Sequence, residues 1–344
     1  MPRTQEFTEG LRFHVQQSRR EVLARNARFL LWKLRGKLGL EVVPQDWVSG
    51  GVDRHEMLRS QCQVVFSHTS FPANTGPLPV VWQNSLLDPE MQLAYGISAE
   101  ALRSESAHKL PFFERAAVVQ VSSENEARRL ERQFPALKGK FQYVPFFQPG
   151  VCAVEEDAVR HKQADGGRLR VLFVGNEARR KGLDRLLEAW RRLPAAVRQR
   201  VELTCVTQFV DGPVEIPRDG LVRVYSGIAH VQVMELMATA HVFAMPSRFE
   251  SYGFVYVEAM ACGTIPVVPN WEVQRELVDE GCAGCITNGE SAELSGLLQR
   301  LVEEPETRMR LALAARKRFC ERYAPEVVAQ RYRQVFRMAM EAGA

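Results

Sequence analysis

Several features that would place this chain in particular protein classes are missing from it. Nowhere do 18 apolar residues follow one another, and the start, Met-Pro-Arg-Thr-Gln, has no apolar segment of a signal peptide. The net charge is only +4 and the basic residues are dispersed, which argues against nucleic acid as a partner. We therefore expect a cytoplasmic protein without a membrane-spanning helix.

Cysteine gives little sign of a metal or redox function. There are 7 cysteines, an odd and scattered set, which indicates reduced thiols. Cys282 and Cys285 form a single Cys-x-x-Cys pair without a second pair or histidines nearby. We interpret them as two small residues at a turn and a strand start rather than as a metal or redox site.

Length and composition are those of a two-domain globular protein. The 344 residues can form two hydrophobic cores, and 46% hydrophobic with 25% charged residues is ordinary for a soluble chain. Strand-like and helix-like patterns alternate in both halves, which is typical of parallel sheets in doubly wound α/β domains. The first half predicts strands at 40–43, 63–67, 79–82, 116–121 and 141–144, with helices at 97–110 and 123–133.

The second half contains a complete alternating series after a stretch without periodicity. Residues 151–167 are therefore predicted as a linker between an N-terminal domain, 1–150, and a C-terminal domain, 168–324. The helix in 325–344 is expected to cross back to the first domain. Strands are predicted at 169–174, 201–206, 221–225, 241–245, 265–268 and 284–287, and helices at 182–193, 231–239, 254–262, 271–280, 291–303, 306–322 and 325–341.

Residues 8–38 are the most basic part of the chain and are rich in helix formers. A basic amphipathic helix with Phe29 and Trp32 could lie on the inner face of an anionic membrane, as a peripheral contact. The same pattern is equally typical of a solvated helix that packs on its own sheet. Both interpretations stay open.

The stretch from Met245 to Gly263 carries the strongest chemical signal. A predicted strand leads through a polar loop with Glu250 into a predicted helix with Glu258. Free N–H groups at a helix start favour a phosphate, and carboxylates accept hydrogen bonds from hydroxyl groups. A phosphate beside a polyol indicates a nucleotide-sugar.

The first strand of the second domain ends in a loop that suits the same ligand. Gly175 permits a tight turn at the carboxyl end of the strand, where open α/β sheets bind ligands. Arg180 and Lys181 follow at the start of the next helix and can neutralise a diphosphate leaving group. The loop is not Gly-x-Gly-x-x-Gly, so nicotinamide cofactors are not indicated.

Residues 165–340 resemble the family-4 retaining glycosyltransferases, enzymes of the GT-B fold. That fold implies two doubly wound Rossmann-like domains facing a central cleft, with a short N-terminal domain in this chain. The resemblance rests on Val174-Gly175, Lys181-Gly182, Met245-Pro-Ser, the Glu250 and Glu258 pair, Gly253-Phe254, Glu258-Ala-Met-Ala-Cys-Gly263, Pro266-Val-Val and Glu276-Leu-Val.

The resemblance implies a role for each matching residue. Glu250 and the loop after it would hold the donor sugar, Glu258 the ribose hydroxyls, and Lys181 with Arg180 the diphosphate. Base contacts are expected from the backbone near 206–209 and at Gly227 and Ile228. The backbone amides expected at the sugar and the phosphate belong to Ser251, Tyr252, Gly253, Phe254 and Val255.

Two positions depart from the family pattern. The family usually has Arg directly after the glycine of the first strand, where this chain has Asn176, and Arg180 or Arg179 is expected to supply the charge. Many members also carry a histidine after a strand of the first domain. His68 is the nearest candidate for that catalytic role, although a histidine at a strand end is equally typical of a structural residue.

These observations predict a hexosyltransferase that moves a sugar from a UDP- or GDP-linked donor to a glycan or to a cell-envelope acceptor, lipid-linked or polysaccharide. If Glu258 binds the ribose, as the resemblance implies, no second carboxylate is free to pair with Glu250, and we expect a same-face substitution instead. No Asp-x-Asp occurs, so no metal is expected. The alternatives are a nucleotide-sugar hydrolase or epimerase of the same fold, and a non-catalytic glycan-binding relative.

Overall fold

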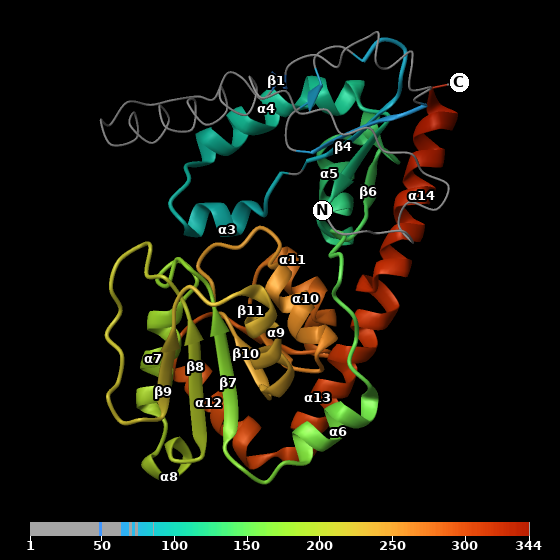
Figure 1. Ribbon diagram of the computed structural model, residues 1–344. Coiled ribbons are helices and arrows are strands. Elements are labelled where there is room, and N and C mark those ends of the chain that lie inside the picture. The colour runs from blue at the N-terminus through green and yellow to red at the C-terminus, as the bar shows by residue number, and fades with distance from the viewer. Residues whose placement is uncertain (1–47, 50–62, 69–70, 73–74, 85, 344) are drawn as a thin grey trace.

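The computed structural model of the protein describes residues 48–49, 63–68, 71–72, 75–84 and 86–343. The described chain contains two larger parallel sheets with helices around them, and one two-stranded parallel pair (Figure 1). The strand predicted at 40–43 and the basic segment 8–38 lie outside the described residues. No helix in the described ranges is long and apolar enough to cross a membrane.

The N-terminal sheet has the order β2-β4-β5-β6, with every pairing parallel. The chain enters each strand from the same end, so all four carboxyl ends lie on one edge. A short pair, β1 (Val48–Ser49) with β3 (Phe71–Pro72), forms a separate sheet, and Phe71 packs on Trp82 of the larger one. The elements of the domain are β2 (Val65–His68), β4 (Val80–Gln83), α3 (Pro89–Ala94), α4 (Ala99–Arg115), β5 (Val118–Val121), α5 (Glu124–Gln133), η1 (Pro135–Leu137) and β6 (Phe141–Tyr143).

The C-terminal sheet has the order β12-β11-β10-β7-β8-β9 and is also parallel throughout. The strand order reverses direction between β7 and β10, which places a topological switch point there. Its strands are β7 (Leu169–Val174), β8 (Val201–Val206), β9 (Val222–Tyr225), β10 (Val242–Ala244), β11 (Ile265–Pro269) and β12 (Cys285–Thr287). Its helices are α7 (Leu183–Arg192), α8 (Ala195–Arg198), α9 (His230–Thr239), α10 (Phe254–Ala261), α11 (Glu272–Leu277), η2 (Asp279–Gly281), α12 (Ser291–Glu303), α13 (Pro305–Arg318) and the π-helical η3 (Phe319–Tyr323).

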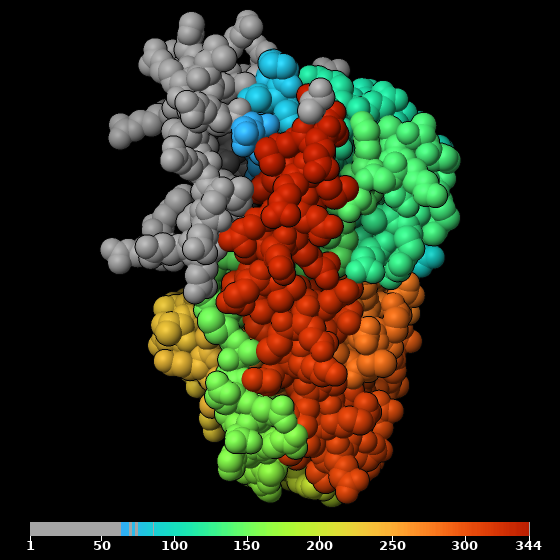
Figure 2. Space-filling view, turned by 90° about the vertical axis from the view of Figure 1, so that its right-hand side faces the viewer, coloured from blue at the N-terminus to red at the C-terminus, as the bar shows by residue number. Residues whose placement is uncertain are grey.

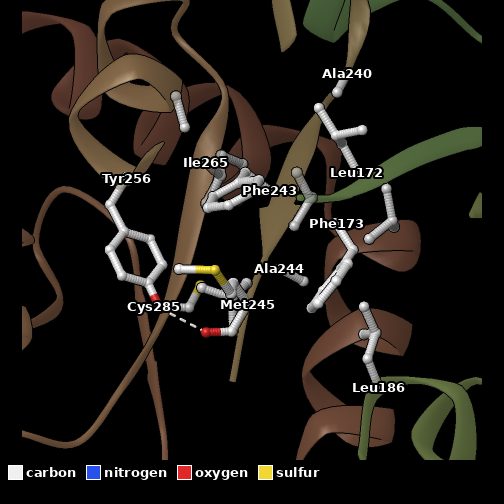
Figure 3. Packing of buried hydrophobic residues seen from close by; sticks show 14 of the residues in the cluster. Leu172, Phe173, Leu186, Ala240, Phe243, Ala244, Met245, Tyr256, Ile265 and Cys285 are labelled. Carbon is white, nitrogen blue, oxygen red and sulfur yellow. Dashed lines mark hydrogen bonds between the residues drawn. The ribbon is translucent and has the colours of Figure 1, made fainter. Parts of the chain in front are cut away.

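The strand β10 and the helix α10 pack against each other in the apolar core of the C-terminal half. Phe243 of β10 lies against Tyr256 of α10, with ring centroids 5.6 Å apart, and both side chains are fully buried (Figure 3). The Tyr256 hydroxyl donates a hydrogen bond to the Met245 carbonyl at 2.5 Å. This bond fixes the distance between the strand end and the helix, and therefore the shape of the loop between them.

Residues 151–167 contain a helix, α6 (Glu156–Ala164), that their sequence did not predict. Its buried side chains are Val159 and Gln163, too few to produce a recognisable apolar period. Val159 packs so closely on Gly263 that a Cβ at that glycine would lie 2.3 Å from a Val159 methyl group. The expected irregular linker is therefore partly helical and belongs to the core of the C-terminal half.

The C-terminal helix α14 (Pro325–Ala342) runs from the second sheet to the first (Figures 1 and 2). Its Val328, Val335 and Phe336 pack with Val81 and Val118 of β4 and β5. In the same core the Tyr332 hydroxyl accepts hydrogen bonds from Gln83 Nε2 at 3.3 Å and Gln120 Nε2 at 2.9 Å. The last helix thus supplies one face of the N-terminal core.

Candidate active site

A buried ion pair lies at the carboxyl edge of the C-terminal sheet. Lys181, in the loop after β7, donates from Nζ to Oε2 of Glu250, in the loop after β10. The Lys181 side chain is 16% exposed and that of Glu250 is 8% exposed. Two of the predicted site residues, 69 positions apart in sequence, are therefore in direct contact.

Glycines allow the two loops to approach each other. Gly182 has a φ of 82°, and a Cβ there would lie 2.2 Å from the Pro246 carbonyl oxygen. A Cβ on Gly175 would lie 2.9 Å from Cγ of Lys181. At Gly182 the clash is with backbone, so only glycine fits there, whereas a side chain at Gly175 would displace the stem of Lys181.

The segment after Glu250 bends into α10 through another left-handed glycine. Gly253 has a φ of 90° and caps α10, and a Cβ there would meet the Tyr256 ring at 2.3 Å. Gln274 of α11, fully buried, donates to the carbonyls of Glu250 at 3.1 Å and Tyr252 at 2.9 Å. The loop is held from both sides, and the first amides of α10, at Phe254 and Val255, begin a helix whose N-terminal N–H groups have no intrahelical acceptor.

The side chains in that segment face in different directions. Tyr252 is buried against Phe146, with ring centroids 4.6 Å apart, and burial raises its pKa well above the ordinary value. Phe254 is 44% exposed, and its carbonyl accepts from Gln148 Nε2 at 3.1 Å. Ser251 is exposed. Tyr252 can therefore offer a ligand its backbone but not its hydroxyl.

Glu258 lies in α10, one turn after the capping glycine. Its Oε1 is 2.9 Å from Nε2 of His230, the first residue of α9. The turn before α9 contains Gly227, with a φ of 69°, and Ile228. The residues predicted for ribose and base are thus neighbours, and His230 is a contact that the sequence did not reveal.

Arg180 ties three loops together. Its Nη1 donates to the Phe249 carbonyl at 2.8 Å, its Nε to Glu177 at 2.7 Å, and its backbone N–H to Asp211 at 2.7 Å. The carbonyl of Asn176 accepts from the Val210 N–H at 2.9 Å, which joins the first loop to the one after β8. The guanidinium of Arg180 lies beside the Glu250 loop but already has protein partners.

The N-terminal domain closes the site from the opposite side. Met91 of α3 is buried, and its sulfur accepts from the Glu250 N–H at 3.3 Å. The ring of Tyr95 packs on Phe249 with centroids 4.9 Å apart. The dipeptide Asp88-Pro89, a cap followed by a proline at the first helical position, is the sequence signal that could have revealed α3.

Capping carboxylates cross the interface in both directions. Asp88 accepts from the N–H of Glu90 in its own α3 and from the N–H of Glu272 at the start of α11, both at 2.9 Å. In return, Glu276 of α11 accepts from the first two amides of α5, those of Glu124 and Asn125, at 2.8 Å. Each domain therefore satisfies helix-end N–H groups of the other.

His68 ends β2 at the edge of the N-terminal sheet, exposed and in register with Gln83. Among the described residues it makes no hydrogen bond or ion pair with Glu250, Lys181 or Glu258. Within the same ranges, no three His, Cys, Asp or Glu side chains gather closely enough to hold a metal ion. Cys282 and Cys285 are free thiols, the first exposed and the second buried.

Two parallel α/β sheets, each with helices around it, are the architecture of the GT-B fold. Comparison with known proteins agrees. Residues 154–318, a little under half of the chain, match the family described as glycosyl transferases group 1. UDP-glucose-bound HepE from Anabaena superposes with a TM-score of 0.54 at 18% identity, over 75% of this chain and 71% of that one.

The sequence is also similar to those of curated proteins, among them two that differ in identity and coverage. The chain is 33% identical over 168 residues to the MMP alpha-(1->4)-mannosyltransferase of Mycolicibacterium hassiacum, over 46% of this chain and 40% of that protein. It is 26% identical over 316 residues to the alpha-maltose-1-phosphate synthase of Mycobacterium tuberculosis, over 81% and 79% respectively. The first match thus spans less than half of its relative, and the second spans most of it.

Proposed function

We propose that this protein is a retaining, metal-independent hexosyltransferase that uses a UDP- or GDP-linked sugar and a glycan or cell-envelope acceptor. The observation that carries the proposal is the Lys181–Glu250 ion pair at the start of α10. A cation can bind a phosphate, a carboxylate can accept hydrogen bonds from sugar hydroxyls, and the first N–H groups of α10 can bind an anion, which supports the proposal. The UDP-glucose complex of its structural neighbour HepE supports a nucleotide-sugar as the donor class.

In this proposal each residue binds a different part of the donor. Glu250 accepts hydrogen bonds from the sugar, Lys181 and the amides of Phe254 and Val255 bind the diphosphate, and Glu258 binds the ribose. The base lies at the turn with Gly227 and Ile228. Arg180 acts mainly by holding the Glu250 loop, because its guanidinium is engaged by Glu177 and Phe249.

The proposed reaction is a same-face substitution. The acceptor hydroxyl attacks the anomeric carbon as the bond to the diphosphate breaks, and its proton passes to the departing phosphate oxygen. The Lys181 ammonium stabilises the charge that develops on that oxygen. Glu250 is a poor nucleophile for a two-step route, because its carboxylate is neutralised by Lys181 and its loop is anchored by Gln274.

The acceptor side and the cellular setting stay predictions. His68 is proposed as a residue near the reacting sugar, and the basic segment 8–38, outside the described residues, as a peripheral membrane contact. The names of the two relatives above, a mannosyltransferase and a maltose-1-phosphate synthase, describe different activities and therefore do not identify the acceptor of this chain. A lipid-linked and a polysaccharide acceptor are therefore both tested.

Donor binding is the first experiment. Calorimetry with UDP, GDP and their glucose and mannose conjugates is expected to show binding of one nucleotide series, and a ligand at 100 times its dissociation constant stabilises the fold by about 2.7 kcal/mol. Absence of any binding at millimolar UDP or GDP would overturn the enzyme proposal and favour a glycan-binding protein.

Transfer is the second experiment. With the donor identified, NMR of the product is expected to show the donor's anomeric configuration, at a rate unchanged by EDTA. Glu250→Gln is expected to lower kcat by about 100-fold or more, as loss of a preorganised site group does, while the exposed Glu303→Gln keeps the wild-type rate. Release of free or epimerised sugar at equal rates with and without acceptor would favour a hydrolase or epimerase.

A further inference from the structure

His230 holds one oxygen of the proposed ribose carboxylate. Its Nε2 lies 2.9 Å from Oε1 of Glu258, at the first position of α9. The His230 side chain is 65% exposed, whereas that of Glu258 is 12% exposed. An exposed ring thus reaches over a nearly buried carboxylate from the turn that contains Gly227 and Ile228.

The direction of the hydrogen bond follows from the chemistry of the pair. A carboxylate only accepts, so the hydrogen lies on Nε2 of His230. With Oε1 engaged in this way, Oε2 of Glu258 has no protein partner among the described residues. The contact therefore selects which oxygen of Glu258 is presented to a ligand.

Orientation matters because a glutamate side chain has several rotatable bonds. Its freedom must be lost when it binds a ligand, and that loss opposes binding. The turn before α9 is itself fixed, since Ala229 N–H donates to Gln232 Oε1 at 2.9 Å. A histidine anchored at this turn can hold Glu258 in one rotamer before the donor arrives.

We propose that His230 is a positioning residue that orients Glu258 toward the ribose and so makes the site selective for ribonucleotides over 2′-deoxyribonucleotides. This inference rests on the proposed function of Glu258. A carboxylate held in one orientation binds a ligand with a correctly placed hydroxyl more tightly than a ligand without it. A carboxylate that is free to rotate distinguishes the two ligands less well. His230 acts through Glu258 and touches no reacting atom.

The test compares two ligands that differ by one hydroxyl group. Dissociation constants are measured by calorimetry for UDP and 2′-deoxy-UDP, or for the guanosine pair if GDP binds more tightly. The wild-type protein is expected to bind the ribonucleotide more tightly than the deoxyribonucleotide. His230→Ala is expected to lower the ratio of the two dissociation constants by about fivefold, the factor that one net hydrogen bond represents. His230→Gln, whose amide can still donate, is expected to restore most of it.

The matched control is His161→Ala. His161 is also an exposed histidine on a helix of the C-terminal half, in the last turn of α6, but its Nδ1 contacts the Asp157 carbonyl of its own helix at 2.7 Å. This variant is expected to keep the wild-type preference. Equal weakening of both nucleotides by His230→Ala would mean that His230 only supports the fold of α9, and would overturn the inference.

The two proposals fail in distinguishable ways. If the wild-type protein binds neither UDP nor GDP, the proposed function itself is wrong. If it binds the ribonucleotide preferentially and His230→Ala keeps the same ratio, the function stands and the role of His230 is wrong. A Glu258→Gln variant that abolishes the preference would show that the discrimination passes through this carboxylate.

Discussion

The C-terminal and N-terminal sheets are both parallel, and both turn the carboxyl ends of their strands toward the interface between them. On the C-terminal side polar side chains are in contact, Lys181 with Glu250 between two loops and His230 of α9 with Glu258 of α10. On the N-terminal side the described loops contribute helix caps and packing, through Asp88 and Met91.

The two domains therefore contribute different kinds of residue to the interface: proposed ligand-binding groups on the C-terminal side, and packing and capping groups on the N-terminal side. Charged groups that bind a phosphate or a hydroxyl must have the right residue type at a fixed backbone position, so they leave short motifs in the sequence. Packing and capping groups can be exchanged for others of similar size or polarity, so they leave little pattern. Four changes test this contrast.

The largest effect is expected where the two loops of the C-terminal side touch. Gly182→Ala forces a left-handed residue and brings a methyl group to 2.2 Å from the Pro246 carbonyl. Left-handed backbone and overpacking together should cost about 4 kcal/mol in the free energy of unfolding, measured in urea. The control, Gly296→Ala, lies within α12 with nothing within 4 Å of the new Cβ, and should stabilise by about 1 kcal/mol.

The next effect concerns the buried ion pair. Lys181→Met leaves the Glu250 carboxylate without its cation, which should destabilise the protein by about 3 kcal/mol. The double variant Lys181→Met with Glu250→Gln should recover most of this loss, because neither charge is then left unpaired. A double variant no more stable than Lys181→Met would show that the pair is not coupled.

A smaller effect is expected at the interface caps. Asp88→Ala removes a cap from α3 and another from α11, and should cost about 2 kcal/mol, about 1 for each helix. Ser98→Ala removes one exposed cap from α4 and should cost about 1 kcal/mol. Equal losses for the two variants would mean that the contact between Asp88 and α11 contributes nothing.

The stabilities of the two domains should also depend on pH in opposite directions. Glu126 in the N-terminal domain has its pKa raised to about 8, mainly because it is buried. The folded state holds this proton while the unfolded chain, at its ordinary value of 4.5, has lost it. Stability attributable to Glu126 therefore falls as pH rises from about 4.5 to about 8.

His241 in the C-terminal domain behaves in the opposite sense. Burial and the neighbouring Arg170 lower its pKa from 6.5 to about 4, and its Nδ1 accepts from the Arg170 N–H at 2.9 Å. The unfolded chain takes up the proton first, so stability attributable to His241 is lost as pH falls from about 6.5 to about 4.

Urea unfolding at several pH values separates these contributions. Relative to the wild type, Glu126→Gln should gain stability toward pH 8 and His241→Gln toward pH 4, because a glutamine does not titrate. The exposed His161→Gln should follow the wild-type curve throughout. Parallel curves for all four proteins would show that neither buried group titrates on unfolding.

Much of the C-terminal half was predictable. Alternation of apolar runs and helix periods placed β7 and β8 at their observed bounds, and the glycines and charges placed Lys181 and Glu250 on loops at the right end of the strands. The segment with α6 was missed because two buried residues are too few to show a period. α3 was missed because it has only six residues, although Asp88-Pro89 marked its start.

The sequence by itself determined the local geometry, because a left-handed glycine, a capping residue or a buried strand acts on its immediate neighbours. Only the tertiary structure decided which distant groups meet: Lys181 with Glu250, His230 with Glu258, and Asp88 with the start of α11. Such pairs depend on the order of parallel strands and on how two domains pack. No spacing along the chain records that order, because residues on neighbouring strands lie close in space at any separation in sequence.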